Sequence, residues 1–539
     1  MELIDQHTKK IMEGCKDRAR EAGLRFQDET LEYIVTNRDL IELSPKVMIP
    51  TLYDYWVHDV EVLKEKGKYE LYPSNPYETV INTRPAISFY NDNNPDWLNV
   101  MIFYHVIGHI DFFQNNIFFK NTWDMDFTGH ALSDKRMIAR LRSEKGRWVD
   151  YIIEFTRSID NLVGYHEELA KLNRPQKTFA TSKLDFYFDV FLQSEKKVSV
   201  GDYVKEIERY NDCVKNYQDM GEETFFSEID RKYPEFLAVY KKSQESKSEN
   251  KPDIVQFIMD NSENLNKEEN KWMKSVMQII RKTSLFFQPQ IRTKIMNEGW
   301  ASYWHETLFL RDDRIKGHEV DFARVNAGVT AMPRVGLNPY ALGMRLFYYL
   351  EDMANKGQYS FKYRSLKDSY KRKIFDEKTG RGKKFIFDTR ENLCDFMFIN
   401  TFIDQDFTDL NNLFVVGKRL NEQKMVWEYY VQSKSAKDYK NMVIDSLYHP
   451  PLVEVDTEKT DDKKLYLVHR FEDKPLVKEY IHNTMVGIEY LWGGPVSLET
   501  SEVLSISAPR ANTGNMEPVV KWQRVVYTMD NRKISRKII

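Results

Sequence analysis

Cysteine is scarce in this chain of 539 residues, and the three that occur, Cys15, Cys213 and Cys394, lie far apart in the sequence. No CxxC pair is present, which argues against a disulfide framework and against a zinc site built from thiolates. Long apolar runs are also missing, and no stretch of 18 apolar residues could form a membrane span. The charged N-terminal segment lacks the apolar core of a signal peptide, so secretion is not indicated.

An excess of charge of one sign is also missing. The formal net charge is -3, from 79 basic and 82 acidic residues. A balance this close to zero argues against nucleic acid as the main partner. Hydrophobic residues make up 42% and aromatic residues 14% of the chain, which is enough for a large core. We therefore expect a folded, cytoplasmic protein whose length allows two to four domains.

The hydrophobic patterns predict an α+β protein that is predominantly α-helical. We expect residues 1–435 to form a mainly helical domain and residues 436–539 a small C-terminal α/β domain. In the second part, "KLYLVHRF" and "VVYTMDNRKISRKI" are typical of strands, and "PLVKEYIHNTMVGIEYLW" is typical of a helix. A polar stretch at about 220–270 contains "KKSQESKSENKPD" and predicts an insertion or a mobile loop.

Two helices and a strand region are marked by their flanking residues. The β-branched and aromatic segment at 77–94 predicts one or two strands closed by a turn. The helix that follows is expected to begin at Pro95 and Asp96 and to be buried, although Gly108 weakens the helical pattern. Further on, Asn338 is expected to cap a helix whose first position is Pro339.

Histidines gather in two short stretches, "YHVIGHIDFF" and "NEGWASYWHETL", although the chain has only 11 of them. Residues four apart share a helix face, so His105 and His109 can point to one place. Glu298 and His305 are seven apart, nearly two turns, and also share a face. Together they could enclose one divalent metal ion, Zn²⁺ or else Mn²⁺, Fe²⁺ or Co²⁺. The alternative is that these are core histidines satisfied by hydrogen bonds.

The pattern differs from the HExxH zinc helix at one position. There the residue after the first histidine is a glutamate that acts as general base, whereas here Val106 follows His105. Another base would then be needed. Glu306 and Asp111 are candidates if their helices bring them to the metal, and His305 could act as the base instead of as a ligand.

Other candidates have a structural alternative that residues of these types adopt more often. Two tyrosines could donate to an oxyanion or simply pack in the core, namely Tyr104 and Tyr303. Three asparagines could orient metal ligands or lie at helix ends, namely Asn115, Asn116 and Asn297. Three residues could contact an anionic substrate, namely Arg334, Asn338 and His469. Three tryptophans are expected in the core, namely Trp300, Trp304 and Trp492.

Four separated motifs resemble those of the SpoVR family, the stage V sporulation protein R-like proteins. They are "YHVIGHIDFFQNN", "PQIRTKIMNEGWASYWHETL", "LNPYALG" and "IEYLWGGPVSLET", and their order fits from about residue 30 to residue 500. The resemblance implies a bacterial or archaeal cytosolic protein. It also implies a link to spore-cortex peptidoglycan or to stress physiology, with a PrkA-type serine kinase and a von Willebrand factor-like protein as partners. It names no reaction.

A second resemblance concerns the metal. "NEGWASYWHE" is similar to the "EGWA" segment of certain gluzincin-type metallopeptidases, in which that glutamate is the third zinc ligand. This implies a zincin-like helical core in which His105 and His109 match the two histidine ligands and Glu298 matches the third. Val106 departs from that pattern at the position of the peptidase base.

Three functions follow from these residues. The first is a metal-dependent enzyme that hydrolyses an amide bond or transfers an acyl group, on a peptide or a peptidoglycan-related substrate. The second is a non-enzymatic adaptor or regulator, stabilised by the metal, that works with the kinase and the von Willebrand factor-like partner. The third is redox chemistry at iron or manganese, since two histidines and a carboxylate resemble the facial triad of non-haem iron enzymes.

Overall fold

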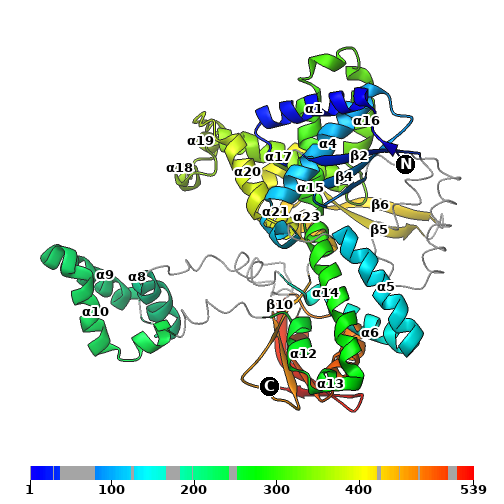
Figure 1. The fold of residues 1–539 in the computed structure, drawn as a ribbon. Helices are drawn as coiled ribbons and strands as arrows, with labels where there is room; N and C mark the ends of the chain where they lie inside the picture. Colours follow the sequence, from blue (N-terminus) through cyan, green and yellow to red (C-terminus); the bar gives the residue numbers. More distant parts are fainter. Residues whose placement is uncertain are drawn as a thin grey trace. The chain divides into compact units, whose positions relative to one another are not determined.

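The fold was taken from a computed structural model (Figure 1). The structure describes residues 2–27, 29–36, 79–122, 127–164, 183–196, 198, 200–241, 252–421, 426–447, 450–471, 474–507 and 519–539. The chain divides into two compact units, one of Met1–Val163 with Ile258–Ile539 and one of Gly164–Phe257. The division expected at residue 435 falls inside the first unit and stays a prediction. Most of the segment expected to be a mobile loop, 241–253, lies outside the described residues.

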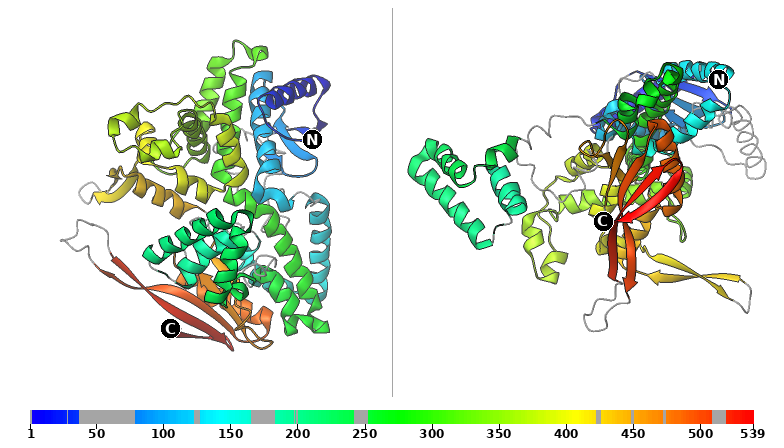
Figure 2. Two further views of the ribbon diagram at one scale, coloured as in Figure 1. Left: turned by 90° about the vertical axis from the view of Figure 1, so that its left-hand side faces the viewer. Right: turned by 90° about the horizontal axis from the view of Figure 1, so that it is seen from below.

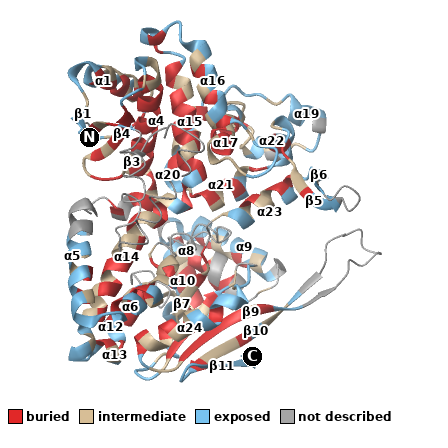
Figure 3. Ribbon diagram, turned by 90° about the vertical axis from the view of Figure 1, so that its right-hand side faces the viewer, coloured by how far each residue is buried: buried red, intermediate tan, exposed pale blue. Residues whose placement is uncertain are grey.

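The centre of the first unit is α4 (Asp96–Asn115), which follows Pro95 as predicted. Every residue of α4 from Asn99 to Phe113 is buried, as the red ribbon in Figure 3 shows. A helix that is apolar on all sides must be surrounded by other elements. The predicted buried helix is therefore confirmed, and its two histidines lie inside the protein rather than on its surface.

Two further helices, α15 (Lys294–Phe309) and α17 (Pro339–Asn355), continue this layer, with α15 packed against both α4 and α17. The helices approach closely because small residues lie at the contacts. A Cβ atom added to Gly108 would be 2.8 Å from the Cα atom of Ala301, and one added to Gly299 would be 2.3 Å from the carbonyl carbon of Gly343. Gly108, which weakens the helical pattern in the sequence, is therefore what lets α15 lie against α4.

The first turn of α15 is fixed by a residue from a distant segment. The backbone N–H groups of Ile295 and Met296 donate to the two carboxylate oxygens of Asp395, each at 2.8 Å. Two of the four N–H groups that a helix start leaves unpaired are satisfied in this way. The start of α17 follows the prediction, since Asn338 accepts from the N–H of Ala341 and Pro339 is the first helical residue.

A small mixed sheet in the order β1-β2-β4-β3 belongs to the N-terminal part of the chain. Its strands are β1 (Glu2–Leu3), β2 (Thr30–Val35), β3 (Thr79–Ile81) and β4 (Ala86–Asn91). The last two confirm the strands predicted in segment 77–94. β2 and β4 are parallel, and the other two pairings are antiparallel.

A five-stranded sheet lies at the C-terminal end, in the order β11-β10-β9-β8-β7. Its strands are β7 (Leu452–Val455), β8 (Leu465–Arg470), β9 (Val496–Ser507), β10 (Val519–Asp530) and β11 (Lys533–Ile538). The parallel strands β8 and β9 are joined by α24 (Lys478–Trp492), and the long strands β9 and β10 run side by side in both views of Figure 2. The strands and the helix predicted for this part are confirmed.

Most remaining elements of the first unit are helices. They are α1 (Gln6–Glu21), η1 (Ile117–Thr122), α5 (Phe127–Lys145), α6 (Trp148–Arg157), η2 (Asp160–Leu162), α13 (Glu263–Asn266), η5 (Glu268–Asn270), α14 (Lys271–Arg292), η6 (Asp313–Ile315), α16 (Glu319–Thr330), α18 (Phe361–Ser365), α19 (Ser369–Lys373), α20 (Gly382–Asn392), α21 (Asp395–Phe402), α22 (Gln405–Leu410) and α23 (Ala436–Ser446), with the hairpin β5 (Val415–Asn421) and β6 (Val426–Ser433). No helix in the described ranges is both long enough and apolar enough to cross a membrane.

The second unit is a small helical body with an aromatic core. Its helices are α8 (Lys183–Asp185), the π-helical η3 (Phe186–Glu195), α9 (Val200–Tyr217), η4 (Gln218–Met220) and α10 (Gly221–Lys232); α12 (Ile254–Asn261) follows at the junction of the two units. Tyr187, Phe225 and Phe236 are fully buried in its core. The described chain is thus α+β and predominantly helical with a small C-terminal sheet, as predicted.

The close helix contact at Gly299 gives a first prediction. We expect Gly299→Ala to lower the free energy of unfolding by about 1–3 kcal/mol, because the added methyl group meets backbone atoms of Gly343 that cannot move without shifting α17. Gly328→Ala is the matched control, since Gly328 is an exposed helical glycine whose added Cβ meets no atom within 4 Å. The control is expected to be stabilised by up to about 1 kcal/mol. Urea unfolding of both variants is the measurement, and equal stability of the two would contradict the packing argument.

Candidate metal centre

Three of the predicted ligands meet where α4 and α15 pack together. A nitrogen atom of His105, one of His109 and a carboxylate oxygen of Glu298 all lie within 4.8 Å of one another. The Nε2 atoms of the two histidines are 3.8 Å and 3.4 Å from Oε2 of Glu298. Both histidines are buried, and the side chain of Glu298 is 17% exposed. The cluster therefore lies inside the helical layer, and the carboxylate oxygen that faces the histidines is buried.

The donor set and the spacing fit a divalent metal ion. Two ligand atoms bound to zinc at their usual distances and at a tetrahedral angle are about 3.3 Å apart. The distance of 3.4 Å from His109 to Glu298 is close to this value, and the distance of 3.8 Å from His105 needs only a small side-chain adjustment. Imidazole nitrogen with carboxylate oxygen suits zinc, and it also suits iron or manganese.

His109 is oriented by the residue next to Glu298. Its Nδ1 atom is 2.9 Å from Oδ1 of Asn297, an acceptor, so Nδ1 carries the proton and Nε2 keeps its lone pair. The lone pair is on the nitrogen that faces Glu298. A histidine that ligates a metal usually donates its other N–H to such an acceptor, which fixes the ring. Asn297 thus lies where it can orient a metal ligand, which is one of the two roles that the sequence suggested for it.

His105 is oriented by a longer chain of hydrogen bonds. Asn326 of α16 donates through Nδ2 to Glu306 at 2.7 Å, which turns its Oδ1 atom toward Nε2 of His305 at 2.8 Å. His305 therefore carries its proton on Nε2 and accepts on Nδ1. The Nδ1 atom of His105, 2.8 Å away, is then the donor in that contact. The Nε2 atom of His105 is left as a lone pair that faces Glu298.

These hydrogen bonds determine whether His305, the fourth predicted ligand, has a lone pair available for a metal. Both of its ring nitrogens take part in hydrogen bonds, one to His105 and one to Asn326. Burial, with the neighbouring His105, lowers the pKa of His305 to about 3, so the ring is neutral at physiological pH. In this arrangement His305 presents no lone pair to the place where His105, His109 and Glu298 meet.

Tyr340, which the sequence motifs did not single out, adjoins the cluster. It is the second residue of α17, and its ring stacks on His105 with centroids 5.9 Å apart. Burial by itself raises the pKa of Glu298, but the two neighbouring histidines and a hydrogen bond from Tyr340 hold it below the usual value. Glu298 is therefore an anion ready to bind a cation. The one sequence signal for Tyr340 was its place in the motif "LNPYALG", directly after the predicted helix start.

The two carboxylates considered as bases have other partners. Glu306 accepts from Nδ2 of Asn326 and, at 3.1 Å, from the hydroxyl of Tyr348. Asp111 accepts from the backbone N–H of Arg25 at 2.7 Å and from the indole N–H of Trp300 at 2.8 Å. It also pairs with the guanidinium group of Arg390. Glu306 thus lies at the far end of the chain that orients His105, and Asp111 joins separate segments of the core.

The two tyrosines considered as oxyanion donors are also engaged. The hydroxyl of Tyr104 donates to Oδ2 of Asp312 at 2.8 Å, and the hydroxyl of Tyr303 donates to Glu351 at 2.5 Å. Both rings are fully buried in the main core. Trp300, Trp304 and Trp492 are buried as predicted.

The remaining candidates lie on separate elements. Asn338 caps α17 and donates to the carbonyl groups of Val329 and Ala331. Arg334 is exposed in the loop before it. His469 is on β8 in the C-terminal sheet. Asn115 donates to the carbonyl group of Arg25, while Asn116 donates to those of Arg390 and Leu393.

Comparison with known proteins connects these residues to a family. The family model described as "SpoVR like protein" matches residues 2–449. The uncharacterized protein YcgB of Escherichia coli (strain K12) is 26% identical over 329 residues, an alignment that covers 58% of this chain and 58% of that protein. No solved structure matches. Because the family match spans far more than half of its residues, the chain belongs to the SpoVR family.

Proposed function

We propose that this protein is a metal-dependent enzyme with a zincin-like centre that acts on an amide bond of a peptide or a peptidoglycan-related substrate. The observation that carries the proposal is the convergence of two histidine Nε2 atoms and one carboxylate oxygen. A zinc site that catalyses has three protein ligands and an open fourth position, whereas a structural site is closed by four. With His305 held by His105 and Asn326, the set has three.

A divalent metal bound at this place would polarise the amide carbonyl, which favours both hydrolysis and acyl transfer. It would also lower the pKa of a bound water molecule, which favours hydrolysis. The protein's own groups would orient the reactants. The Asn297 contact and the chain through His305 hold the two histidines in one tautomer each. The phenol of Tyr340, beside Glu298, is the group we assign to hydrogen-bond the substrate oxygen.

Because Val106 follows His105, the general base must differ from the glutamate of HExxH enzymes. Glu306 and His305 act on the centre through hydrogen bonds rather than directly. We propose that Oε1 of Glu298, the carboxylate oxygen that the metal does not use, receives the proton as the reaction proceeds. The link to spore cortex or stress physiology belongs to the same proposal and rests on the family.

The adaptor function has one observation in its favour. The β5–β6 hairpin carries large apolar side chains that are about half exposed, among them Trp427, Tyr429 and Val431. A two-stranded sheet is marginally stable by itself, so a partner that covers these residues would stabilise it. The kinase and the von Willebrand factor-like protein are the partners proposed for this alternative.

Elemental analysis and an amide-hydrolysis assay of the same preparation test the proposal. We expect about one equivalent of zinc and release of amines from a mixture of peptides and peptidoglycan fragments, with the activity lost on chelation and restored by zinc. Tyr340→Phe should lower kcat while metal content is kept. One equivalent of iron or manganese would instead favour the redox function. Metal in a closed four-ligand site, with no activity, would favour the adaptor.

The groups that orient the histidines give a second prediction. We expect Asn297→Ala to weaken metal binding by about 10–100-fold, because His109 loses the acceptor that fixes its ring. Asn392→Ala is the control, since Asn392 is exposed and its side chain bonds only a carbonyl group of its own helix. Competition with a chromogenic chelator measures both affinities, and equal affinity in the two variants would show that Asn297 does not orient His109.

A further inference from the structure

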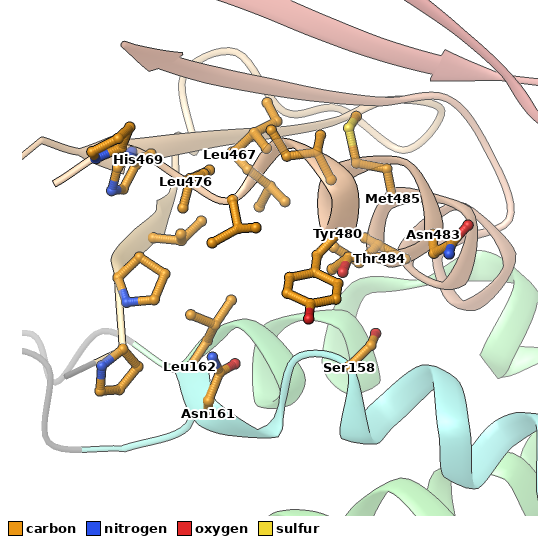
Figure 4. A pocket seen from close by; sticks show the side chains of 18 of the residues that line it. Ser158, Asn161, Leu162, Leu467, His469, Leu476, Tyr480, Asn483, Thr484 and Met485 are labelled. Atoms are coloured by element: carbon orange, nitrogen blue, oxygen red, sulfur yellow. The ribbon is translucent and has the colours of Figure 1, made fainter. Parts of the chain in front are cut away.

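A second site lies in the C-terminal sheet region, beyond most of the residues that the family model matches. A cavity of about 850 Å³ opens between α24, strands β7 and β8, and the α6–η2 segment (Figure 4). Small-molecule sites usually have volumes of about 300–1,000 Å³. The segments around it are firmly packed, since a Cβ added to Gly487 of α24 would be 3.1 Å from the ring of Phe155 on α6. The hollow is therefore a feature of a packed region.

The walls of the cavity are apolar. Leu162, Leu467, Leu476 and Met485 project into it in Figure 4, and Ile488 adds to the lining. Residues of this kind favour the hydrocarbon part of a ligand, because its transfer from water removes apolar surface on both sides. A ligand that fills the cavity therefore needs a substantial apolar body.

Polar side chains form a smaller part of the lining, and those labelled in Figure 4 are Ser158, Asn161, His469, Tyr480, Asn483 and Thr484. His469 is at one end, 94% buried, with Nδ1 bonded to the hydroxyl of Thr500 at 2.8 Å. Lys474 is also in the lining, and so is Val477, which precedes the first turn of α24 and provides no side-chain acceptor for it. A lysine, a histidine and the unpaired N–H groups of a helix start all favour an anion. Glu154 is the one acidic residue among those that line the cavity.

We propose that this cavity binds a free carboxylic acid with a long hydrocarbon chain, in which the chain occupies the apolar part and the carboxylate meets Lys474 and His469. The proposal does not depend on the metal centre, which is built from α4 and α15. It also gives a ligand to His469, which the sequence suggested for contact with an anion.

Binding of cis-parinaric acid, a fluorescent fatty acid, to the full-length protein is the test, followed by displacement with hexadecanoate or hexadecanol. We expect saturable binding of about one equivalent, with hexadecanoate at least about tenfold more effective than the alcohol. Met485→Trp, which fills the cavity, should weaken binding by about tenfold or more. Leu410→Trp is the control, because Leu410 is 70% exposed and lies outside the lining.

A head-group variant separates the two parts of the ligand. Lys474→Gln should weaken binding of the acid and leave that of the alcohol unchanged. Leu476→Trp, at a half-buried position before α24, replaces Met485→Trp if that variant does not fold. Absence of saturable binding, or binding that a folded cavity-filling variant keeps, would overturn the proposal. Equal affinity for the acid and the alcohol would overturn the proposal that the ligand has an acidic head group.

Discussion

Glu298→Gln is expected to abolish the metal binding that we propose for this protein and to leave its fold intact. Glu298 has the one anionic side chain among the three that meet at the α4–α15 contact. A glutamine of the same shape has a neutral oxygen, which binds a divalent cation far more weakly than a carboxylate does. Because even a group that only orients a ligand is worth about 10–100-fold in affinity, we expect the loss of this ligand to exceed about 100-fold.

Elemental analysis after dialysis, with chelator competition for the affinity, measures the effect of Glu298→Gln. Glu391→Gln is the control, since Glu391 is an exposed glutamate on α20. Circular dichroism should be the same for both variants. If the glutamine variant kept a full equivalent of metal, the ion would have to be held elsewhere, and a site that includes His305 would become the better description.

The pairing of the two histidine stretches could be predicted from residue types and spacing. His105 and His109 are one helical turn apart, and a second stretch with a glutamate offered a third ligand of the right kind. Those patterns depend on local helix geometry alone, which the sequence specifies well. The cap at Asn338 was predictable for the same reason, since it depends on a residue and its immediate neighbours.

The place of His305 could not be predicted from its spacing. Seven residues return a helix almost to the same face, but they also advance about 10.5 Å along its axis. Glu298 and His305 share a side of α15, but the ring of His305 bonds His105 and Asn326. Asn326 and Tyr340, which complete the surroundings of the histidines, come from α16 and α17. Their positions beside the histidines depend on how the helices pack, and no local sequence pattern specifies that packing.

Asp111, which the sequence suggested as a base, has a different place in the fold. Its carboxylate pairs with Arg390 of α20 at 3.3 Å, and both side chains are almost completely buried. It also accepts from the N–H of Arg25 and the indole of Trp300. Burial raises the pKa of Asp111 and lowers that of Arg390, in each case against the attraction of the partner. The pair thus joins α4, α15, α20 and the segment after α1 at a high desolvation cost.

Asp111→Ala is therefore expected to lower the free energy of unfolding by about 3–5 kcal/mol, because it leaves the Arg390 guanidinium buried without its carboxylate. The double variant Asp111→Asn/Arg390→Met should recover much of this loss, since neither charge is then buried. Asp352→Asn is the control, because it breaks an exposed pair with Lys356 that is worth less than about 1 kcal/mol. Urea unfolding measures all three. A double variant no more stable than Asp111→Ala would mean that the hydrogen bonds of Asp111, rather than its charge pairing, hold these segments together.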